Sequence, residues 1–122
     1  SSEGTIRKKN TIKRNLKEND YERFSKIQKG ILNRACEMAE RGDQIVYSTC
    51  TFAPEENEQV VNSILEEHSV KLKNINIKNL KMGKGIKNWK DEKFDSEIEK
   101  CRRVWPHHND TDGFFIARFE KC

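Results

Sequence analysis

One cysteine in this sequence lies where a reactive thiol could act. Cys50 directly follows residues 44–49, a β-branched and aromatic run typical of a buried strand, and it precedes Pro54, which favours the start of a helix. Ligands of open α/β sheets bind at the carboxyl ends of the strands, and a helix N-terminus would favour the nucleophilic thiolate form. Cys50 is therefore a candidate nucleophile. The alternative is a packing role, because free cysteines are often buried.

The other three cysteines suggest less chemistry. Cys36 lies beside Ala35 on a predicted helix and is expected to pack, whereas Cys101 and Cys122 fall in a predicted loop and tail. The sequence contains no C-x-x-C pair and no Cys/His cluster at zinc-finger spacing, so we expect no metal site. Isolated cysteines in such a lysine-rich chain indicate reduced thiols and a cytoplasmic protein.

Two segments carry the positive charge. Residues 1–16 contain five Lys or Arg against one Glu, and residues 71–103 contain eleven Lys or Arg against five Asp or Glu. Together they could form one polyanion-binding face, and the alternative is an ordinary solvated surface. The candidate phosphate contacts are Arg7, Lys8, Lys9, Arg102 and Arg103.

Hydrophobic spacing predicts the elements that must position Cys50. A first helix should run from Asp20 to Gly42, and its apolar face should consist of Phe24, Ile27, Ile31, Ala35, Met38 and Ala39. Residues 44–49 should form a strand, and a second helix should extend from Pro54 to about His68.

The last third of the chain is predicted to be less regular. Residues 70–77 suggest a weaker strand whose alternation slips after Leu72, and residues 79–100 suggest a long loop with one short helix. Residues 113–119 are apolar on both alternating sets, as in an interior strand. The order helix, strand, helix, strand, loop, strand fits the second half of a doubly wound α/β sheet.

The composition suggests an incomplete core. The 122 residues suit one domain, but 34% are hydrophobic and 36% charged, against about 45 to 50% and about 25% in typical domains. Either much of the chain is solvated arm and loop, or another segment completes the core. No apolar run is long enough to span a membrane, and the first residues do not resemble a signal peptide.

Three short motifs, spaced along the whole chain, resemble one known family. Residues 48–58 read Ser-Thr-Cys-Thr-Phe-Ala-Pro-Glu-Glu-Asn-Glu, and residues 103–108 and 112–117 place a Pro-His turn before a Gly-Phe-Phe strand. Residues 1–7 resemble those that follow an Asp-x-Pro-Cys motif. In this order the motifs resemble the Sun/RsmB (Nop/Sun) family of RNA cytosine C5-methyltransferases.

The resemblance implies a fold and a domain organisation. Residues 1–122 would be the C-terminal part of one catalytic domain, the C-terminal half of a three-layer α/β/α Rossmann-like methyltransferase fold with an antiparallel last strand. Residues 1–19 would be a basic arm, and residues 20–122 would hold the elements described above. The S-adenosylmethionine site and the Asp-x-Pro-Cys cysteine would lie upstream of Ser1. No cofactor-binding residue is therefore expected in this chain, which should be inactive alone.

The resemblance also implies a reaction. The thiolate of Cys50 would attack carbon 6 of a cytosine, and this attack would make carbon 5 able to accept the methyl group of S-adenosylmethionine. The expected partners are RNA, with tRNA favoured over rRNA, and the missing N-terminal half of the domain. His107 matches the family's Pro-His and is a candidate RNA contact. Trp105 and Trp89 could stack on bases, although Trp105 fits a core position better. The competing function is a noncatalytic RNA-binding or ribosome-associated module with the same fold.

Overall fold

A computed structural model describes residues 18–78, 81–105 and 113–122. The predicted basic arm at residues 1–19 lies outside the described residues except for its last two positions, which belong to the first helix. Four candidate RNA-binding residues also lie outside the description, namely Arg7, Lys8, Lys9 and His107.

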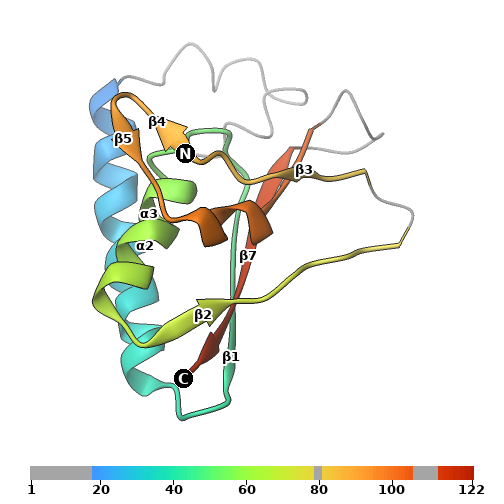
Figure 1. The fold of residues 1–122 in the computed structure, drawn as a ribbon. Coiled ribbons are helices and arrows are strands. Elements are labelled where there is room, and N and C mark those ends of the chain that lie inside the picture. Colours follow the sequence, from blue (N-terminus) through green and yellow to red (C-terminus); the bar gives the residue numbers. More distant parts are fainter. Residues whose placement is uncertain (1–17, 79–80, 106–112) are drawn as a thin grey trace.

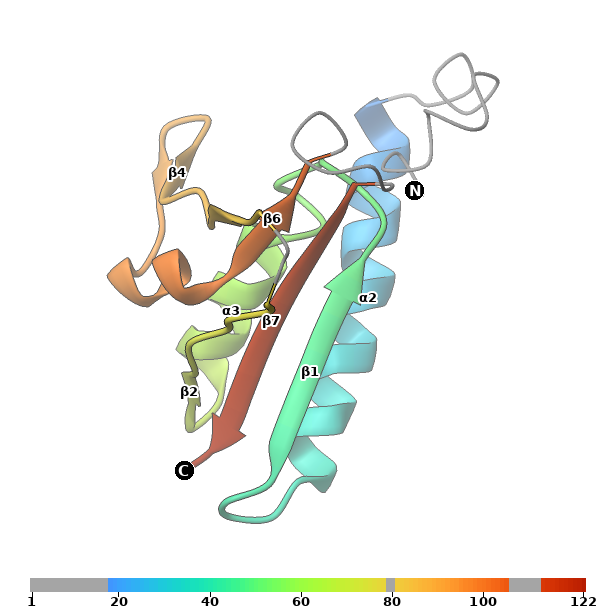
Figure 2. The ribbon, with the colours of Figure 1, turned by 90° about the vertical axis from the view of Figure 1, so that its right-hand side faces the viewer.

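One antiparallel sheet organises the described residues (Figure 1). Its strands in order are β1 (Gln44–Thr49), β7 (Phe114–Lys121), β6 (Arg102–Val104) and β3 (Gly83–Lys84), and β2 (Val70–Leu72) also pairs with β7. β1 pairs along one edge of β7, and β6 and β2 pair with opposite ends of its other edge. Figure 2 shows β7 between β1 and β6. The predicted antiparallel orientation of the last strand is confirmed.

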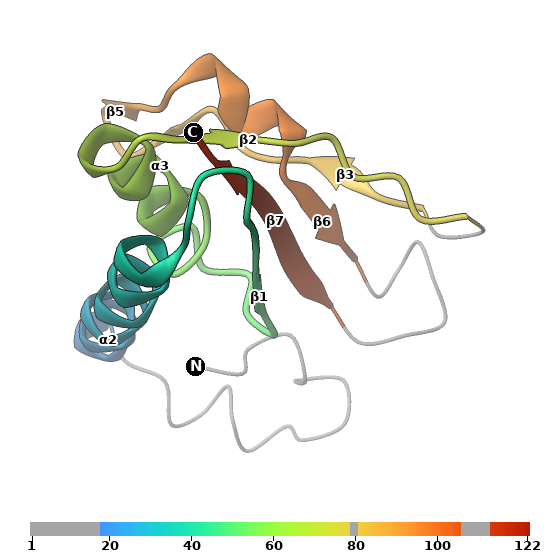
Figure 3. The ribbon, with the colours of Figure 1, turned by 90° about the horizontal axis from the view of Figure 1, so that it is seen from below.

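Two helices, α2 (Glu18–Met38) and α3 (Glu58–Glu67), cover one face of this sheet (Figure 3). Beneath them Phe115, Ala117 and Phe119 of β7 are fully buried, in a core that also includes Ile64 of α3. Among the described residues no helix covers the opposite face, where Val46 is 65% exposed. The described chain therefore provides two of the three predicted layers.

The apolar face predicted for α2 is wrong. Ile27, Ile31 and Met38 are exposed, whereas Leu32 and Cys36 face the core. The inward face of the helix is partly polar and makes specific contacts, because the Gln28 Nε2 donates to Glu56 and the Asn33 Oδ1 lies 2.8 Å from the His68 ring. Polar residues that bond inward cannot be separated from solvated ones by periodicity. Neither described α-helix combines the length and the apolar character of a membrane span.

The turn after α2 reverses the chain at Gly42. The helix ends at Met38 and not at Gly42, but Gly42 adopts a φ of 91° in the connection to β1. This left-handed conformation is costly for residues with a Cβ, and it allows the chain to reverse into the sheet. The Gly42 amide donates to the Lys121 carbonyl at 2.9 Å, which joins this turn to the end of β7.

Residues 81–105 are more structured than predicted. Besides β3 and β6, the segment contains a hairpin of β4 (Asn88–Trp89) and β5 (Glu92–Lys93) and a 3₁₀ helix η2 (Ser96–Lys100). The expected short helix is confirmed as η2. The predicted strand at 70–77 is shorter, because it ends at Leu72 where the alternation slips. Strands of two or three residues are too short to produce a detectable period.

Candidate active-site loop around Cys50

Cys50 lies on the surface at the carboxyl end of β1, one residue after the strand ends at Thr49. Its side chain is exposed, so it does not pack in the core of the described residues. The residue that follows, Thr51, is 1% exposed. Thr49, the residue before Cys50, is half-buried. Of these three residues, therefore, only Cys50 is exposed.

The segment after Cys50 is a turn and not the start of a helix. The Glu56 amide donates to the Ala53 carbonyl at 3.0 Å, and the Asn57 amide donates to the Pro54 carbonyl at 3.2 Å. α3 begins only at Glu58. The predicted helix start at Pro54 is therefore four residues early. Side chains of this turn contact the two residues that flank Cys50.

Asn57 connects the two residues that flank Cys50. The Thr49 hydroxyl donates to its Oδ1 at 2.5 Å, and its Nδ2 donates to the Thr51 carbonyl at 3.0 Å. Asn57 itself is fully buried. A carbonyl oxygen only accepts hydrogen bonds, so the amide of Asn57 can make both contacts in one orientation only.

Glu56 attaches the same loop to β1 and α2. Its carboxylate accepts hydrogen bonds from the Gln28 Nε2 at 2.9 Å and the Thr51 hydroxyl at 3.2 Å. The Tyr47 hydroxyl donates to the Glu56 carbonyl at 2.6 Å. Burial raises the pKa of Tyr47 well above its ordinary value, and the Glu56 carboxylate adds to this effect. The tyrosine therefore remains a neutral hydrogen-bond donor.

Glu58 and Arg103 form a buried ion pair behind the loop. Two guanidinium nitrogens of Arg103 donate to the Glu58 carboxylate at 2.5 and 2.6 Å, and a third donates to the Phe52 carbonyl at 3.0 Å. Arg103 is 3% exposed and Glu58 is fully buried. The Ile86 amide also donates to Glu58, at 3.0 Å. The loop is thereby joined to the strand pair β3 and β6.

This environment corrects the predicted role of Arg103. The sequence suggested a phosphate contact, but the guanidinium is buried and already binds Glu58 and Phe52. Arg102 is half-buried, and its Nη1 donates to the carbonyls of Glu99 and Cys101. A phosphate contact by Arg102 stays a prediction, as do the contacts proposed for the candidates outside the described residues.

The two tryptophans and two of the cysteines can be compared with their predicted positions. Trp105 is half-buried and stacks on Phe52, with ring centroids 5.1 Å apart, and the Trp89 indole donates to Glu55. Cys36 is buried, which confirms its packing role. Cys101 lies in the connection between η2 and β6, as predicted, and it is buried there.

The raised pKa values of the two buried cysteines argue against a catalytic role for either thiol. Burial raises the pKa of Cys36 and, more strongly, that of Cys101, where the Glu58 carboxylate adds to the effect. Across the described residues, no group of three or more His, Cys, Asp or Glu side chains is arranged to hold a metal ion.

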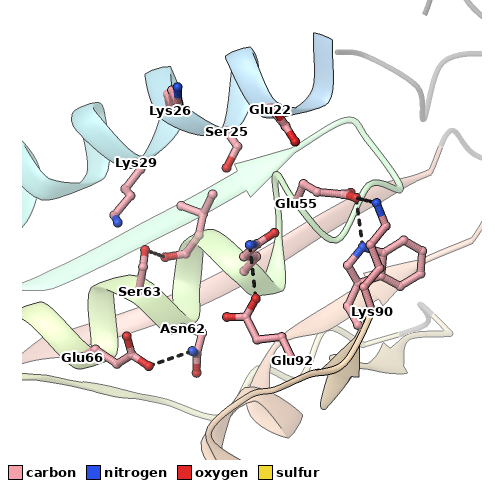
Figure 4. Close-up of a pocket in the computed structure, with 13 residues that line it drawn as sticks. Glu22, Ser25, Lys26, Lys29, Glu55, Asn62, Ser63, Glu66, Lys90 and Glu92 are labelled. Carbon is pink, nitrogen blue, oxygen red and sulfur yellow. Dashed lines mark hydrogen bonds and ion pairs between the residues drawn. The ribbon is translucent and has the colours of Figure 1, made fainter. Parts of the chain in front are cut away.

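A cavity of about 630 Å³ lies between α2, α3 and the β4–β5 hairpin (Figure 4). Cys50 does not line it. Its charged lining residues are of both signs and slightly acidic on balance, namely Glu22, Glu55, Glu66, Glu92, Lys26, Lys29 and Lys90. Such a lining does not favour a phosphate backbone, so the cavity is not a candidate for the RNA path.

Comparison with known proteins agrees with the motif resemblance. A tRNA (cytosine(49)-C(5))-methyltransferase from Pyrococcus abyssi is 35% identical over 121 residues, which cover 99% of this chain and 39% of the relative. A human 28S rRNA (cytosine(4447)-C(5))-methyltransferase is 34% identical over 126 residues, which cover 99% of this chain and 15% of the relative. The chain therefore spans less than half the length of these relatives.

Solved structures agree in fold. A methyltransferase homologue from Pyrococcus horikoshii matches 88% of this chain and 34% of its own with a TM-score of 0.79 at 30% identity. NSun6 from the same organism matches 80% of this chain and 22% of its own with a TM-score of 0.65 at 32% identity. These matches confirm the predicted Rossmann-like α/β methyltransferase fold, and this fold implies S-adenosylmethionine as the cofactor. The family model described as 16S rRNA methyltransferase RsmB/F matches residues 1–120, and the chain belongs to this family.

Proposed function

We propose that this chain supplies the nucleophile half of an S-adenosylmethionine-dependent RNA (cytosine-C5) methyltransferase. The observation that carries the proposal is the exposed thiol of Cys50, held at the end of β1 by buried partners. The relatives named above are methyltransferases of tRNA and rRNA. We propose RNA as the substrate, with tRNA favoured by the basic segments of the sequence.

The reaction assigned to Cys50 is a covalent one. Its thiolate attacks carbon 6 of the target cytosine and forms a carbon–sulfur bond, and the displaced electron pair makes carbon 5 nucleophilic. After carbon 5 has been methylated, loss of its proton re-forms the double bond and expels the thiolate. Cys50 thus returns to its starting state. The exposed position of the side chain at a strand end suits attack on a base in the crevice of the sheet.

The turn that follows β1 does not fit the methyl donor. This turn, residues 50–57, contains no glycine, and the polar side chains of Glu56 and Asn57 already bind protein groups. A donor loop requires glycines where the backbone approaches the ligand closely. We therefore assign donor binding to the part of the domain outside these residues.

We propose that the chain is the C-terminal part of one catalytic domain. Two surfaces support this proposal. Within the described residues the outer edge of β1 pairs with no strand, and the sheet face that carries Val46 lacks a helix. Unpaired edges and uncovered apolar faces of a sheet are normally covered by further structure. The remaining N-terminal half of the domain is the proposed partner at both surfaces.

The nucleophile is tested by trapping. In the complete enzyme we expect Cys50→Ser to abolish methyl transfer and to prevent a covalent adduct with RNA that contains 5-fluorocytosine, because an alcohol does not supply a thiolate at neutral pH. Denaturing gels of enzyme with labelled RNA measure the adduct, and Cys122→Ser, which changes the other exposed cysteine, is the matched control. Undiminished adduct with Cys50→Ser would remove Cys50 as the nucleophile, whereas absence of any adduct with the unsubstituted enzyme would favour the noncatalytic RNA-binding module.

A further inference from the structure

The side chain of Asn57 holds the backbone on both sides of Cys50. It accepts a hydrogen bond from Thr49, the residue before the cysteine, and donates one to the carbonyl of Thr51, the residue after it. Cys50 is the only residue between these two attachment points. Displacement of Cys50 relative to α3 would therefore stretch at least one bond to Asn57.

The bond between Asn57 and Thr51 is protected from competition by water. Asn57 is fully buried and Thr51 is 1% exposed, so an amide group that loses its partner has no solvent to replace it. A further bond braces the same loop, since the Thr51 hydroxyl accepts from the Ala53 amide at 3.1 Å. The exposed thiol thus lies on a loop whose attachments at Thr51 are buried and whose attachment at Thr49 is partly buried.

We infer that Asn57 is a positioning residue that fixes the direction from which Cys50 attacks cytosine. This inference depends on the proposed function, in which Cys50 is the nucleophile. Covalent attack requires the reacting atoms to be aligned, and a displacement of about 1 Å can slow an enzymatic step about 100-fold. Asn57 does not contact the cysteine side chain through any bond described above. It acts on the backbone of the two neighbouring residues.

Two variants remove one bond each. Asn57→Asp keeps an acceptor for the Thr49 hydroxyl but places a carboxylate oxygen against the Thr51 carbonyl, which cannot donate. Thr49→Val removes the hydroxyl with little change in shape, and Thr49→Ser retains it. Because Thr49 is only half-buried, its variants keep the test decisive if Asn57→Asp fails to fold.

A matched control removes a comparable amide elsewhere. Asn62 lies on α3 and is 5% exposed, and its side chain accepts from the Asp95 amide and donates to Glu66. Asn62→Asp therefore introduces the same chemical change into a similar environment that is not attached to Cys50. A general loss of stability would affect both Asn variants.

The experiment compares two reactions of the same thiol in the complete enzyme. Alkylation of Cys50 by iodoacetamide requires an exposed thiolate but no alignment, whereas adduct formation with 5-fluorocytosine RNA requires both. Peptide mapping after alkylation reports folding as well, because Cys36 and Cys101 are buried and react only in unfolded protein. RNA affinity is measured separately, so that slower attack is not confused with weaker binding.

We expect Asn57→Asp and Thr49→Val to slow adduct formation about 100-fold, with unchanged RNA affinity and unchanged alkylation of Cys50. Thr49→Ser should restore the rate, and Asn62→Asp should match the unsubstituted enzyme. The inference is overturned if Thr49→Val forms the adduct at the normal rate, or if Asn62→Asp slows it equally. Failure of the proposed function would look different, because adduct would then persist in Cys50→Ser or be absent from the unsubstituted enzyme.

Discussion

Arg103 and Cys50 lie in segments that both suggested function, yet their surroundings give them different roles. Arg103 follows another arginine in a basic segment, so the sequence favoured a phosphate contact. Its actual partner, Glu58, lies 45 positions earlier in the chain, and no local pattern reveals such a pair. Removing one partner of a buried pair typically costs about 3 to 5 kcal/mol, because the remaining charge is left without compensation. Arg103 therefore stabilises the Cys50 loop from within the protein.

The buried cysteines predict how stability depends on pH. Burial raises the pKa of Cys36 and Cys101 above the ordinary thiol value of 9.0. The unfolded chain releases these protons at its ordinary pKa while the folded chain retains them, so their contribution to stability is complete below about pH 9 and is lost above it. We expect the free energy of unfolding of the enzyme to fall progressively as the pH rises above about 9.

Cys101→Ala isolates this effect. The variant has lost one buried thiol, so its free energy of unfolding should fall less steeply over the same pH range. Urea-induced unfolding at each pH measures both proteins. Cys122→Ala is the control, since its thiol is exposed. A fall of equal size in Cys101→Ala and in the unsubstituted enzyme would contradict the assignment.

At the scale of elements, the sequence predicted the longer strands, whose hydrophobic residues form a continuous run. β7 was expected at 113–119 and extends over Phe114–Lys121, and the strand expected at 44–49 is β1. The apolar face of α2 was assigned wrongly, because its inward side bonds through polar groups such as Gln28. The strands of residues 81–105 were missed because β3 and β6 are defined by distant pairing. Cys50 was predicted from its motif, whereas the buried contacts of Asn57 leave no signature in spacing alone.

Alanine substitutions at two glycines should change the stability of the protein in opposite directions. A Cβ at Gly85 would lie 2.2 Å from the Ile98 carbonyl oxygen, which belongs to the backbone of η2. Gly85→Ala must therefore displace η2, and overpacking of this kind costs about 1 to 3 kcal/mol. Gly30 lies inside α2, and a Cβ there meets nothing within 4 Å. Gly30→Ala should stabilise the protein by about 0.5 to 1 kcal/mol, because glycine is the more flexible residue in the unfolded chain.

Thermal unfolding of the two variants measures this contrast. The midpoint should fall for Gly85→Ala and rise for Gly30→Ala. Because the substitution is chemically the same, the difference reports the surroundings alone. Equal shifts in the two variants would show that the close approach between Gly85 and η2 is absent in solution.

At the scale of the whole molecule, the described residues leave one sheet face without a helix and the outer edge of β1 unpaired, which agrees with the proposal that this chain is part of a larger catalytic domain. The described residues provide the thiol of Cys50 but no glycine-rich donor loop after β1. We therefore expect this chain alone not to bind S-adenosylmethionine measurably. Isothermal titration calorimetry, with the complete enzyme as the positive control, provides the test. A micromolar dissociation constant for the isolated chain would show that its own residues form the donor site.

The basic segments are expected to contact the phosphates of the RNA. Each phosphate contact that is removed should flatten the dependence of log affinity on log salt concentration by about 0.7 for single-stranded RNA. We expect Arg102→Ala to lower the slope by about 0.7 and Lys8→Ala/Lys9→Ala to lower it by about 1.4, with little change in base preference.

The matched control for this experiment is Lys26→Ala, because Lys26 lines the cavity whose charged residues are slightly acidic on balance. RNA affinity of the complete enzyme, measured at several salt concentrations, gives the slope for each variant. Lys26→Ala should keep the slope of the unsubstituted enzyme. Arg103→Ala is not informative here, because the side chain is buried against Glu58 and its loss would disturb the Cys50 loop. If the Arg102 and Lys8/Lys9 variants also keep that slope, these charges form a solvated surface and the RNA follows another path across the protein.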